Sequence, residues 1–414
     1  MSWLLSRSEL TAEQLRAVEL PPTEHRLILG GPGAGKTQVL LHRTAFLRDR
    51  LGLKPQDYRL FVFTNVLSKY IRAGLDDLRI PQSCVSTFDN WCVTFHRKHL
   101  GPEPRSTEVD RWGRPKADYP GVRRAVLTHL EATRSEPLLA CALVDEGQDL
   151  DEQAFRLLCR MARHVTVCMD RKQQIYEQRA DEKAVLRQLG LRNRNLALLD
   201  ALRCSPYVTE LAAALVEDPE EGRAFSAQAR TPQIERESPV LYLASDFEDE
   251  RQRLIDVMQV RRRAGDRIGV LLPQKRQVFG FAKGLQEAGL DVEVQERVDF
   301  STDLPKVLTY HSAKGLTFDS VMMPRLVNGS FPRLTQAQVE RLMFVGVSRA
   351  VKWVYMSSTA ARSAFAPFEK LRDLEQRGRL TVQRRGVAAP ASSDAGRPSE
   401  PTETSDEEDW LDVL

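Results

Sequence analysis

The chain has 414 residues, which is long for one hydrophobic core and sufficient for two domains and a terminal segment. Its residues are 42% hydrophobic and 28% charged, as in ordinary globular proteins, and no apolar stretch approaches the roughly 18 residues of a membrane helix. The six cysteines form no Cys-x-x-Cys pair, which excludes metal centres of that spacing and favours free thiols in a reducing compartment. We therefore expect a cytoplasmic protein with no membrane partner.

The net charge of +3 hides an uneven distribution along the chain. Residues 393–414 contain eight acidic residues and one arginine, so their net charge is −7 and residues 1–392 carry +10. A moderately basic body favours polyanionic partners such as nucleic acid, although a solvated surface of mixed charge produces the same balance.

The first predicted elements are a strand, a glycine-rich loop and a helix. Residues 26–29 are an apolar run typical of a buried strand, and residues 38–50 place apolar side chains at helical spacing. The loop between them, GGPGAGKT at residues 30–37, has glycines whose dihedrals let several backbone N–H groups face one anion. Lys36 supplies a charge for the β- and γ-phosphates, and Thr37 supplies a hydroxyl for Mg²⁺. This arrangement predicts a nucleoside triphosphate site.

Apolar runs of four to seven residues alternate with helical stretches along the rest of the chain. Such alternation is typical of parallel sheets covered by helices on both faces, so we predict an α/β fold in two halves. The predicted strands of the first half are residues 59–64, 138–145 and 165–170. Those of the second half are residues 196–199, 240–244, 267–272, 306–310, 320–324 and 351–357.

Two adjacent carboxylates end the predicted strand at residues 138–145. Asp145 is suited to hold Mg²⁺ through water, and Glu146 is suited to orient or deprotonate an attacking water. Adjacent acidic residues are common on protein surfaces, so the pair gains meaning only from its continuation as DEGQD through Asp149.

That string resembles the DE(A/F)QD box of superfamily-1A helicases of the UvrD/Rep/PcrA type, and other segments resemble further motifs of this family in the family's order. These segments are residues 11–18 (TAEQLRAV), 61–65 (FVFTN), 86–88 (STF), 170–176 (DRKQQIY), 202–206 (LRCSP), 307–319 (VLTYHSAKGLTFD) and 340–350 (ERLMFVGVSRA). The resemblance implies two RecA-like P-loop NTPase domains with parallel sheets, followed by a disordered acidic tail. It also implies ATP and Mg²⁺ as the cofactors.

The resemblance further implies roles for individual residues, with two arginines of the second half reaching across a cleft to the phosphates. The implied catalytic residues are Lys36, Thr37, Asp145, Glu146, Gln173, Arg203 and Arg349, and the implied metal ligands are Thr37 and Asp145. The implied nucleotide-binding residues are Gln14, Gly30, Gly31, Pro32, Gly33, Ala34, Gly35, Lys36, Thr37, Gln38, Arg43 and Gly315. The implied nucleic-acid contacts are Phe63, Thr64, Asn65, Thr87, Phe88, Tyr176, His311 and Ser312.

Four positions depart from the family pattern. Gln178 stands in place of a base-stacking tryptophan, and Leu202 stands in place of the tyrosine on adenine. Thr317 replaces a glutamate, and Met169 replaces a glycine. Because base stacking contributes roughly 1–3 kcal/mol per base, we expect a weakened grip on the single strand. The residues implied in hydrolysis are better preserved than those implied in strand contact.

We predict a first RecA-like ATPase domain over residues 1–195, a second over residues 196–385 and a disordered acidic tail over residues 386–414. The first domain carries a short basic insertion at about 97–137, which is either a solvated charged loop or a nucleic-acid contact. The second lacks the large insertion of the family. The tail is a solubilising appendage, or residues 406–414 dock a protein partner through their tryptophan and aliphatic side chains.

The resemblance implies an ATP hydrolase acting as a 3′–5′ single-stranded DNA translocase or helicase, with single-stranded or tailed DNA as partner and RNA not excluded. One alternative keeps the ATPase without the motor, as an ATP-gated nucleic-acid sensor or assembly switch serving a nuclease or other effector in phage defence or repair. A second alternative is a non-catalytic interaction module on the same fold.

Overall fold

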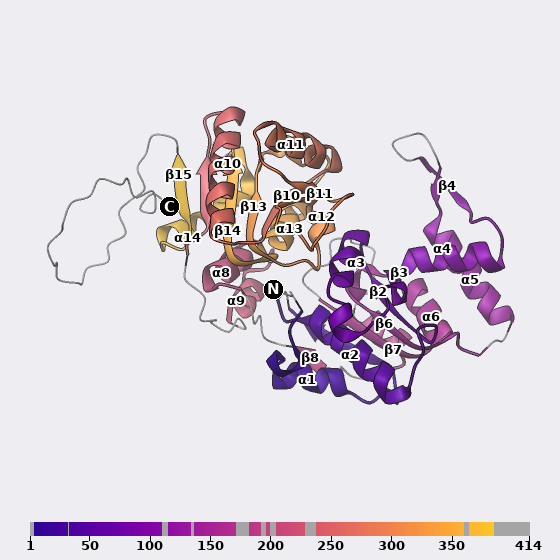
Figure 1. Cartoon of the computed structure of the whole chain (residues 1–414). Coiled ribbons are helices and arrows are strands. Elements are labelled where there is room, and N and C mark those ends of the chain that lie inside the picture. Colours follow the sequence, from indigo (N-terminus) through magenta and orange to yellow (C-terminus); the bar gives the residue numbers. More distant parts are fainter. Residues whose placement is uncertain are drawn as a thin grey trace.

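The structure, a computed structural model, describes residues 4–31, 33–109, 115–133, 136–170, 182–191, 196–198, 204–227, 237–359 and 364–384. Two α/β halves, each built around one parallel sheet, lie beside one another (Figure 1). The central strands are buried apolar runs, as expected for sheets that helices cover on both faces. No helix in the described part of the chain is long and apolar enough to cross a bilayer.

The first half contains a six-stranded sheet in the order β3-β2-β6-β7-β1-β8, with every pairing parallel. Its strands are β1 (Arg26–Gly30), β2 (Tyr58–Val62), β3 (Val85–Thr87), β6 (Leu139–Val144), β7 (Ala162–Met169) and β8 (Leu196–Leu198). Its helices are α1 (Ala12–Glu19), α2 (Lys36–Leu51), α3 (Asn65–Arg72), α4 (Phe88–His99), α5 (Tyr119–Ala132), α6 (Glu152–Met161) and α7 (Glu182–Gln188).

The second half contains a seven-stranded parallel sheet in the order β11-β12-β10-β13-β14-β9-β15. Its strands are β9 (Val240–Leu243), β10 (Ile268–Leu272), β11 (Glu293–Val294), β12 (Lys306–Thr309), β13 (Phe318–Met323), β14 (Ala350–Ser358) and β15 (Thr381–Arg384). Its helices are α8 (Pro206–Ala214), α9 (Pro219–Ala227), α10 (Phe247–Arg263), α11 (Lys275–Glu287), α12 (Tyr310–Ala313), α13 (Gln336–Val347) and α14 (Arg372–Gln376).

The two sheets confirm the predicted fold class of two RecA-like halves, but one strand lies in the other half. β8 pairs in parallel with β1, with Ile28 opposite Leu196, so residues 196–198 complete the first sheet. The prediction that the second half starts at residue 196 is therefore wrong. The chain already belongs to the second half at Ser205, whose N–H donates to the carbonyl of Val351 on β14.

The insertion of the first half contributes α5 and a two-stranded antiparallel ribbon, which form a small lobe together with α4 (Figure 1). The ribbon strands are β4 (Arg105–Val109) and β5 (Pro115–Ala117). Three of the lobe's arginines are compensated by carboxylates, because Arg97 and Arg105 both pair with Glu103 and Arg123 bridges Asp89 and Asp151. These pairs weaken the nucleic-acid interpretation of the insertion and favour a structural one.

The two halves touch through α3 and the segments that follow β11 and β12. Lys69 on α3 donates from Nζ to the carbonyl oxygen of Glu296 at 2.9 Å, and Tyr70 packs edge-on against Phe300 with ring centroids 5.0 Å apart. One hydrophobic cluster runs through both halves and includes Leu67 on α3 and Leu316 after α12. This junction places the end of β1 opposite the beginning of β14.

Candidate active site

The phosphate loop follows β1 and leads directly into α2. Gly33 and Gly35 have φ of 76° and 79°, in the left-handed region that favours glycine. A Cβ at position 35 would lie 2.3 Å from Nε2 of Gln14, so a side chain there would displace the Gln14 amide in addition to straining the left-handed backbone. The first turn of α2, which starts at Lys36, therefore presents its backbone N–H groups at the tip of the loop.

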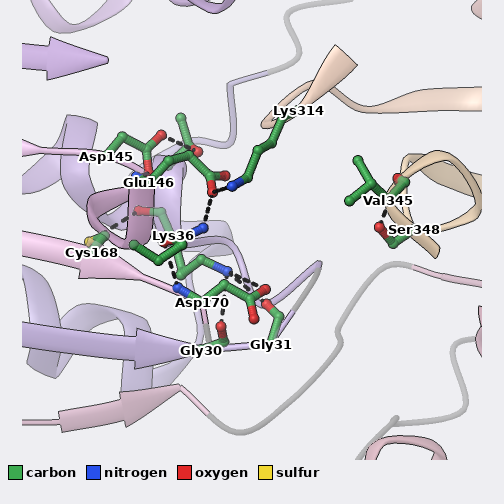
Figure 2. Close-up of polar contacts among 12 residues, drawn as sticks. Gly30, Gly31, Lys36, Asp145, Glu146, Cys168, Asp170, Lys314, Val345 and Ser348 are labelled. Atoms are coloured by element: carbon green, nitrogen blue, oxygen red, sulfur yellow. Dashed lines mark hydrogen bonds and ion pairs between the residues drawn. The ribbon is translucent and has the colours of Figure 1, made fainter. Parts of the chain in front are cut away.

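Lys36 lies inside the loop with 7% of its side chain exposed. Its Nζ donates to the carbonyl oxygens of Gly30 and Gly31, each at 2.9 Å, and to Oδ2 of Asp170 at 3.3 Å (Figure 2). Asp170 follows β7 and is itself fixed, because its N–H donates to Oε1 of Gln148 at 2.9 Å. The loop lysine is thus held between two strand ends, β1 and β7.

Asp145 follows β6 and faces the first turn of α2. The hydroxyl of Thr37 donates to its Oδ2 at 2.7 Å, and the N–H of Glu146 donates to its Oδ1 at 3.0 Å. Burial, together with the neighbouring Glu146, raises the pKa of Asp145 to about 6, although Thr37 and Lys36 act in the opposite direction. A hydroxyl and a carboxylate beside a phosphate loop are hard oxygen donors of the kind that Mg²⁺ uses with nucleotide phosphates, so these residues fit that ion.

Glu146 occupies a strained backbone position, with φ 54° and ψ 42°. Its carboxylate accepts from Nε2 of Gln148 at 2.5 Å and lies 3.6 Å from Nζ of Lys314 in the second half. Burial by itself would raise the pKa of Glu146, but the charges of Lys314, Lys36 and Arg349 lower it below the ordinary value. A buried, ionised carboxylate next to Asp145 is suited to accept a proton from water.

Arg349 faces these carboxylates from the second half, at the start of β14. Its guanidinium donates to the carbonyl oxygens of Val345 at 3.1 Å and Leu316 at 3.4 Å, and to Oγ of Ser348 at 3.0 Å. Burial lowers the pKa of Arg349, and the charges of Glu146 and Asp170 counteract this. A cavity lies between the two halves and is lined by residues of both. These residues are Gly33, Gly35, Lys36, Thr37, Gln38, Tyr70, Glu146, Cys204, Gly315, Thr317, Ser348, Arg349, Ala350 and Val351.

Two predicted nucleotide contacts have other partners. Arg43 is a correction: its buried guanidinium donates to the carbonyls of Val18 and Leu20 and to Oγ1 of Thr166, so it fixes α2 to α1 and β7 away from the cavity. Gln14 accepts from the N–H of Thr11 and donates to the carbonyl of Ala34 at 3.1 Å. It therefore braces the phosphate loop, and adenine recognition by Gln14 stays a prediction.

The residues predicted to contact a nucleic-acid strand differ in exposure. Phe88 is a correction: it is 3% exposed and packs edge-on against Phe61 in the core, which leaves no ring face for a base. The hydroxyls of Thr64 and Thr87 cap α3 and α4. Phe63, His311 and Ser312 are half-buried and Asn65 is exposed, near the junction of the halves. The predicted site residues Pro32, Gln173, Tyr176 and Arg203, with Gln178, Leu202 and the tail, lie outside the described residues.

Three polar residues of the site were not predicted from the sequence: Gln148, Asp149 and Lys314. Nζ of Lys314 donates to Oδ2 of Asp149 at 2.5 Å, and both side chains are fully buried. Figure 2 shows Lys314 extending from the second half toward Glu146. Their position in the sequence could have pointed to them, because all three lie within the segments that resemble the family motifs.

Sequence comparisons agree with this arrangement of two halves. Residues 10–103 match the UvrD/REP helicase N-terminal domain, and residues 301–361 match the UvrD-like helicase C-terminal domain. The chain is 32% identical over 134 residues to the ATP-dependent DNA helicase PcrA of Staphylococcus epidermidis, a match that covers 30% of this chain and 17% of that protein. It is 34% identical over 110 residues to PcrA of Staphylococcus aureus, covering 25% and 15%.

Among solved structures, the C-terminal domain of a possible DNA helicase from Lactobacillus plantarum WCFS1 aligns with 44% of this chain and 98% of its own length. The TM-score is 0.34 and the sequence identity 15%, so this likeness does not inform the fold. The two family matches, in contrast, fall on the phosphate-loop half and on the Arg349 half, in that order. Over these segments the chain resembles the UvrD/Rep/PcrA-like superfamily-1A helicases.

Proposed function

We propose that this chain is an ATP hydrolase that translocates along single-stranded DNA in the 3′–5′ direction. The observation that carries the proposal is the cavity between the halves, where Lys36 and Glu146 face Arg349. Phosphoryl transfer depends mainly on positioning and on neutralisation of charge, and these three side chains supply both from opposite walls. Because the match covers a small part of each PcrA relative, ATP hydrolysis is inferred from the site itself, whereas single-stranded DNA as substrate and the 3′–5′ direction rest on the motif resemblance.

The chemistry assigns one task to each group. Lys36 binds the β- and γ-phosphates in place of the carbonyls of Gly30 and Gly31, and Thr37 and Asp145 would hold Mg²⁺, which neutralises phosphate charge when bound. Glu146 orients a water and accepts its proton. Arg349 stabilises the negative charge that develops on the transferred phosphoryl group, a contribution worth about 10³–10⁵ in rate for arginine fingers. Gln173 and Arg203 belong to the same proposal.

The position of the site explains how hydrolysis could drive movement. The phosphates bind to one half and the arginine belongs to the other, so ATP favours approach of the halves and hydrolysis favours their separation. A strand held by Phe63 and Asn65 of the first half and by His311 of the second would then shift with each cycle. We propose the two sheets, divided between residues 198 and 205, as the two moving domains.

The second candidate function is an ATP-gated sensor or assembly switch that couples nucleic-acid binding to an effector protein. The observation that favours it is the poor provision for strand contact: Phe88 lies in the core, and Arg97, Arg105 and Arg123 of the small insertion lobe are paired with carboxylates. The segment 406–414 is the proposed docking element for the effector. Deleting residues 393–414 is then expected to leave ATPase activity intact while abolishing capture of the partner.

One assay separates these functions. ATPase activity is measured with and without 3′-tailed duplexes of DNA and RNA, and unwinding is followed on the same substrates. Strong stimulation with unwinding supports the motor, and stimulation without unwinding supports the switch. Absence of ATPase activity under all conditions rejects both and leaves the non-catalytic module.

A further inference from the structure

Lys314 connects the two halves at a point between the cavity and the residues that are predicted to contact single-stranded nucleic acid. We propose that Lys314 is a positioning residue, a latch whose ion pairs with Asp149 and Glu146 transmit strand binding to the hydrolytic carboxylate. The inference rests on the proposed ATPase function and specifies how that site is regulated.

The ion pairs of the latch are buried and cross from one half to the other. Lys314 follows α12 in the second half, whereas Asp149 ends the short 3₁₀ turn η4 (Gly147–Asp149) of the first half, after β6. Nζ of Lys314 lies 2.5 Å from Oδ2 of Asp149 and 3.6 Å from Oε2 of Glu146. The side chains of Lys314 and Asp149 are 0% exposed and that of Glu146 is 5% exposed.

Burial makes this contact dependent on the approach of the halves. An ammonium and a carboxylate lose their hydration when buried, and only mutual attraction and hydrogen bonds offset that loss. When the halves separate, Lys314 leaves with α12, while Asp149 and Glu146 remain with β6. Two carboxylates would then face each other without their shared cation, so Glu146 keeps its arrangement only in the closed state.

The same lysine adjoins the residues expected to touch the strand. Its Nζ lies 5.6 Å from the centroid of the Phe63 ring, within the range of a cation–π contact. His311 lies one helical turn before Lys314, and Thr309 caps that turn by accepting from the N–H of Ser312. A nucleic-acid strand that contacts Phe63 and His311 therefore touches two residues that lie beside Lys314.

Gly315 fixes the distance at which the latch forms. Its φ is +79°, and a Cβ there would lie 2.8 Å from Cδ2 of Leu67 on α3. The loop after α12 therefore packs directly against α3, the helix that Thr64 caps and that follows Phe63. Small displacements of α3 relative to α12 reach Lys314 without an intervening flexible segment.

The test compares Lys314→Met with the wild type in the full-length chain. We expect the oligo-dT-stimulated kcat to fall at least about tenfold, since a buried carboxylate pair loses its cation. We expect KM for ATP and the Kd for oligo-dT to stay within about twofold of the wild type, because the proposal places neither ligand on the ammonium. Lys314→Arg should restore part of the stimulation, and the exposed Lys283→Met serves as the matched control.

Two further measurements keep the test decisive. The double variant Lys314→Met/Asp149→Asn removes both charges of the buried pair, so no unpaired buried charge is left to disturb folding. It should fold and bind oligo-dT, while oligo-dT should not stimulate its ATPase activity. A fluorophore pair at the exposed positions Lys54 and Lys275 reports approach of the halves with a non-hydrolysable ATP analogue and oligo-dT.

The fluorescence readout separates failure of the latch from failure of the proposed function. Wild-type closure with no closure in Lys314→Met supports the latch even if the wild type does not hydrolyse ATP. Full closure and full stimulation in Lys314→Met would overturn the latch while leaving the ATPase proposal intact.

Discussion

The two walls of the cavity are organised differently. On the first wall, side chains bind one another: Lys36 reaches Asp170, Thr37 reaches Asp145, and Gln148 joins Glu146 to Asp170. On the second wall, Arg349 is held mainly by backbone oxygens of its own half. The first wall is thus held mostly by its own side chains, with Glu146 the member that also pairs with the second half through Lys314, which suggests that one half binds the nucleotide and the other determines when it reacts.

Loss of the loop lysine tests the first wall and should have the largest effect. Lys36→Ala removes the only charge that the phosphate loop itself supplies, so ATP turnover should fall to background and nucleotide affinity should fall with it. A coupled ATPase assay and titration with a fluorescent ATP analogue measure the two effects. Lys54→Ala, an exposed lysine of the same half, should behave as the wild type. Appreciable turnover by Lys36→Ala would contradict the assignment of the loop.

Loss of Arg349 tests the second wall and should separate binding from reaction. Arg349→Ala should lower kcat by about 10³-fold or more, since the residue acts on charge that develops only in the transition state. Nucleotide affinity should change little, because the first wall stays intact. Arg276→Ala provides an exposed arginine of the same half as control. An equal loss of affinity and kcat would mean that the walls do not divide these tasks.

Two glycine-to-alanine substitutions, one in the phosphate loop and one in α11, should have smaller and opposite effects. Gly35→Ala places a methyl group 2.3 Å from Nε2 of Gln14 at φ +79°, so the Gln14 amide that braces the loop must move and the left-handed backbone is strained; nucleotide affinity should fall about tenfold or more. In α11, by contrast, Gly280→Ala meets nothing within 4 Å and should raise the unfolding free energy by roughly 0.5–1 kcal/mol. Urea unfolding and analogue binding of both variants check the pair. Unchanged affinity in Gly35→Ala would show that the loop is freer than the packing indicates.

A further prediction concerns acid stability of the first half. Burial, with the charges of Arg43 and His25, lowers the pKa of His164 to about 3. The unfolded chain takes up a proton below about pH 6.5 and the folded chain does not, so stability falls as the pH decreases from 6.5 toward 3. The expected slope approaches about 1.4 kcal/mol per pH unit.

Urea unfolding of the wild type between pH 7.5 and 5 measures this slope, and His164→Gln should flatten it. His99→Gln, on the exposed end of α4, is the matched control. An unchanged slope in His164→Gln would place the acid sensitivity elsewhere.

Local patterns were sufficient for much of the fold. The strand–loop–helix around residues 30–37 and the strand before Asp145 form as predicted, because apolar run length, glycine spacing and helical periodicity are encoded within a short segment. β8 was misplaced because three apolar residues between two halves carry no information about which sheet they join.

The errors and omissions in the site have a common physical cause. Phe88 and Arg43 have the residue types of contact residues, but only tertiary packing decides that a ring faces the core or that a guanidinium binds carbonyls. Lys314 acquires its role from a partner 165 positions away in sequence, which no local spacing reveals. Sequence patterns therefore predict which side chains of the first wall lie together better than they predict the contacts across the cavity.

The left-handed backbone of Glu146 has a consequence for protein engineering. A non-glycine residue in this conformation costs of order 1–3 kcal/mol, and here that cost falls on the residue assigned to activate water. Glu146→Gly should therefore give a more heat-resistant protein that no longer turns over ATP. Selection for thermal tolerance alone would favour that exchange, so a stabilisation screen of this protein needs an activity criterion to retain Glu146.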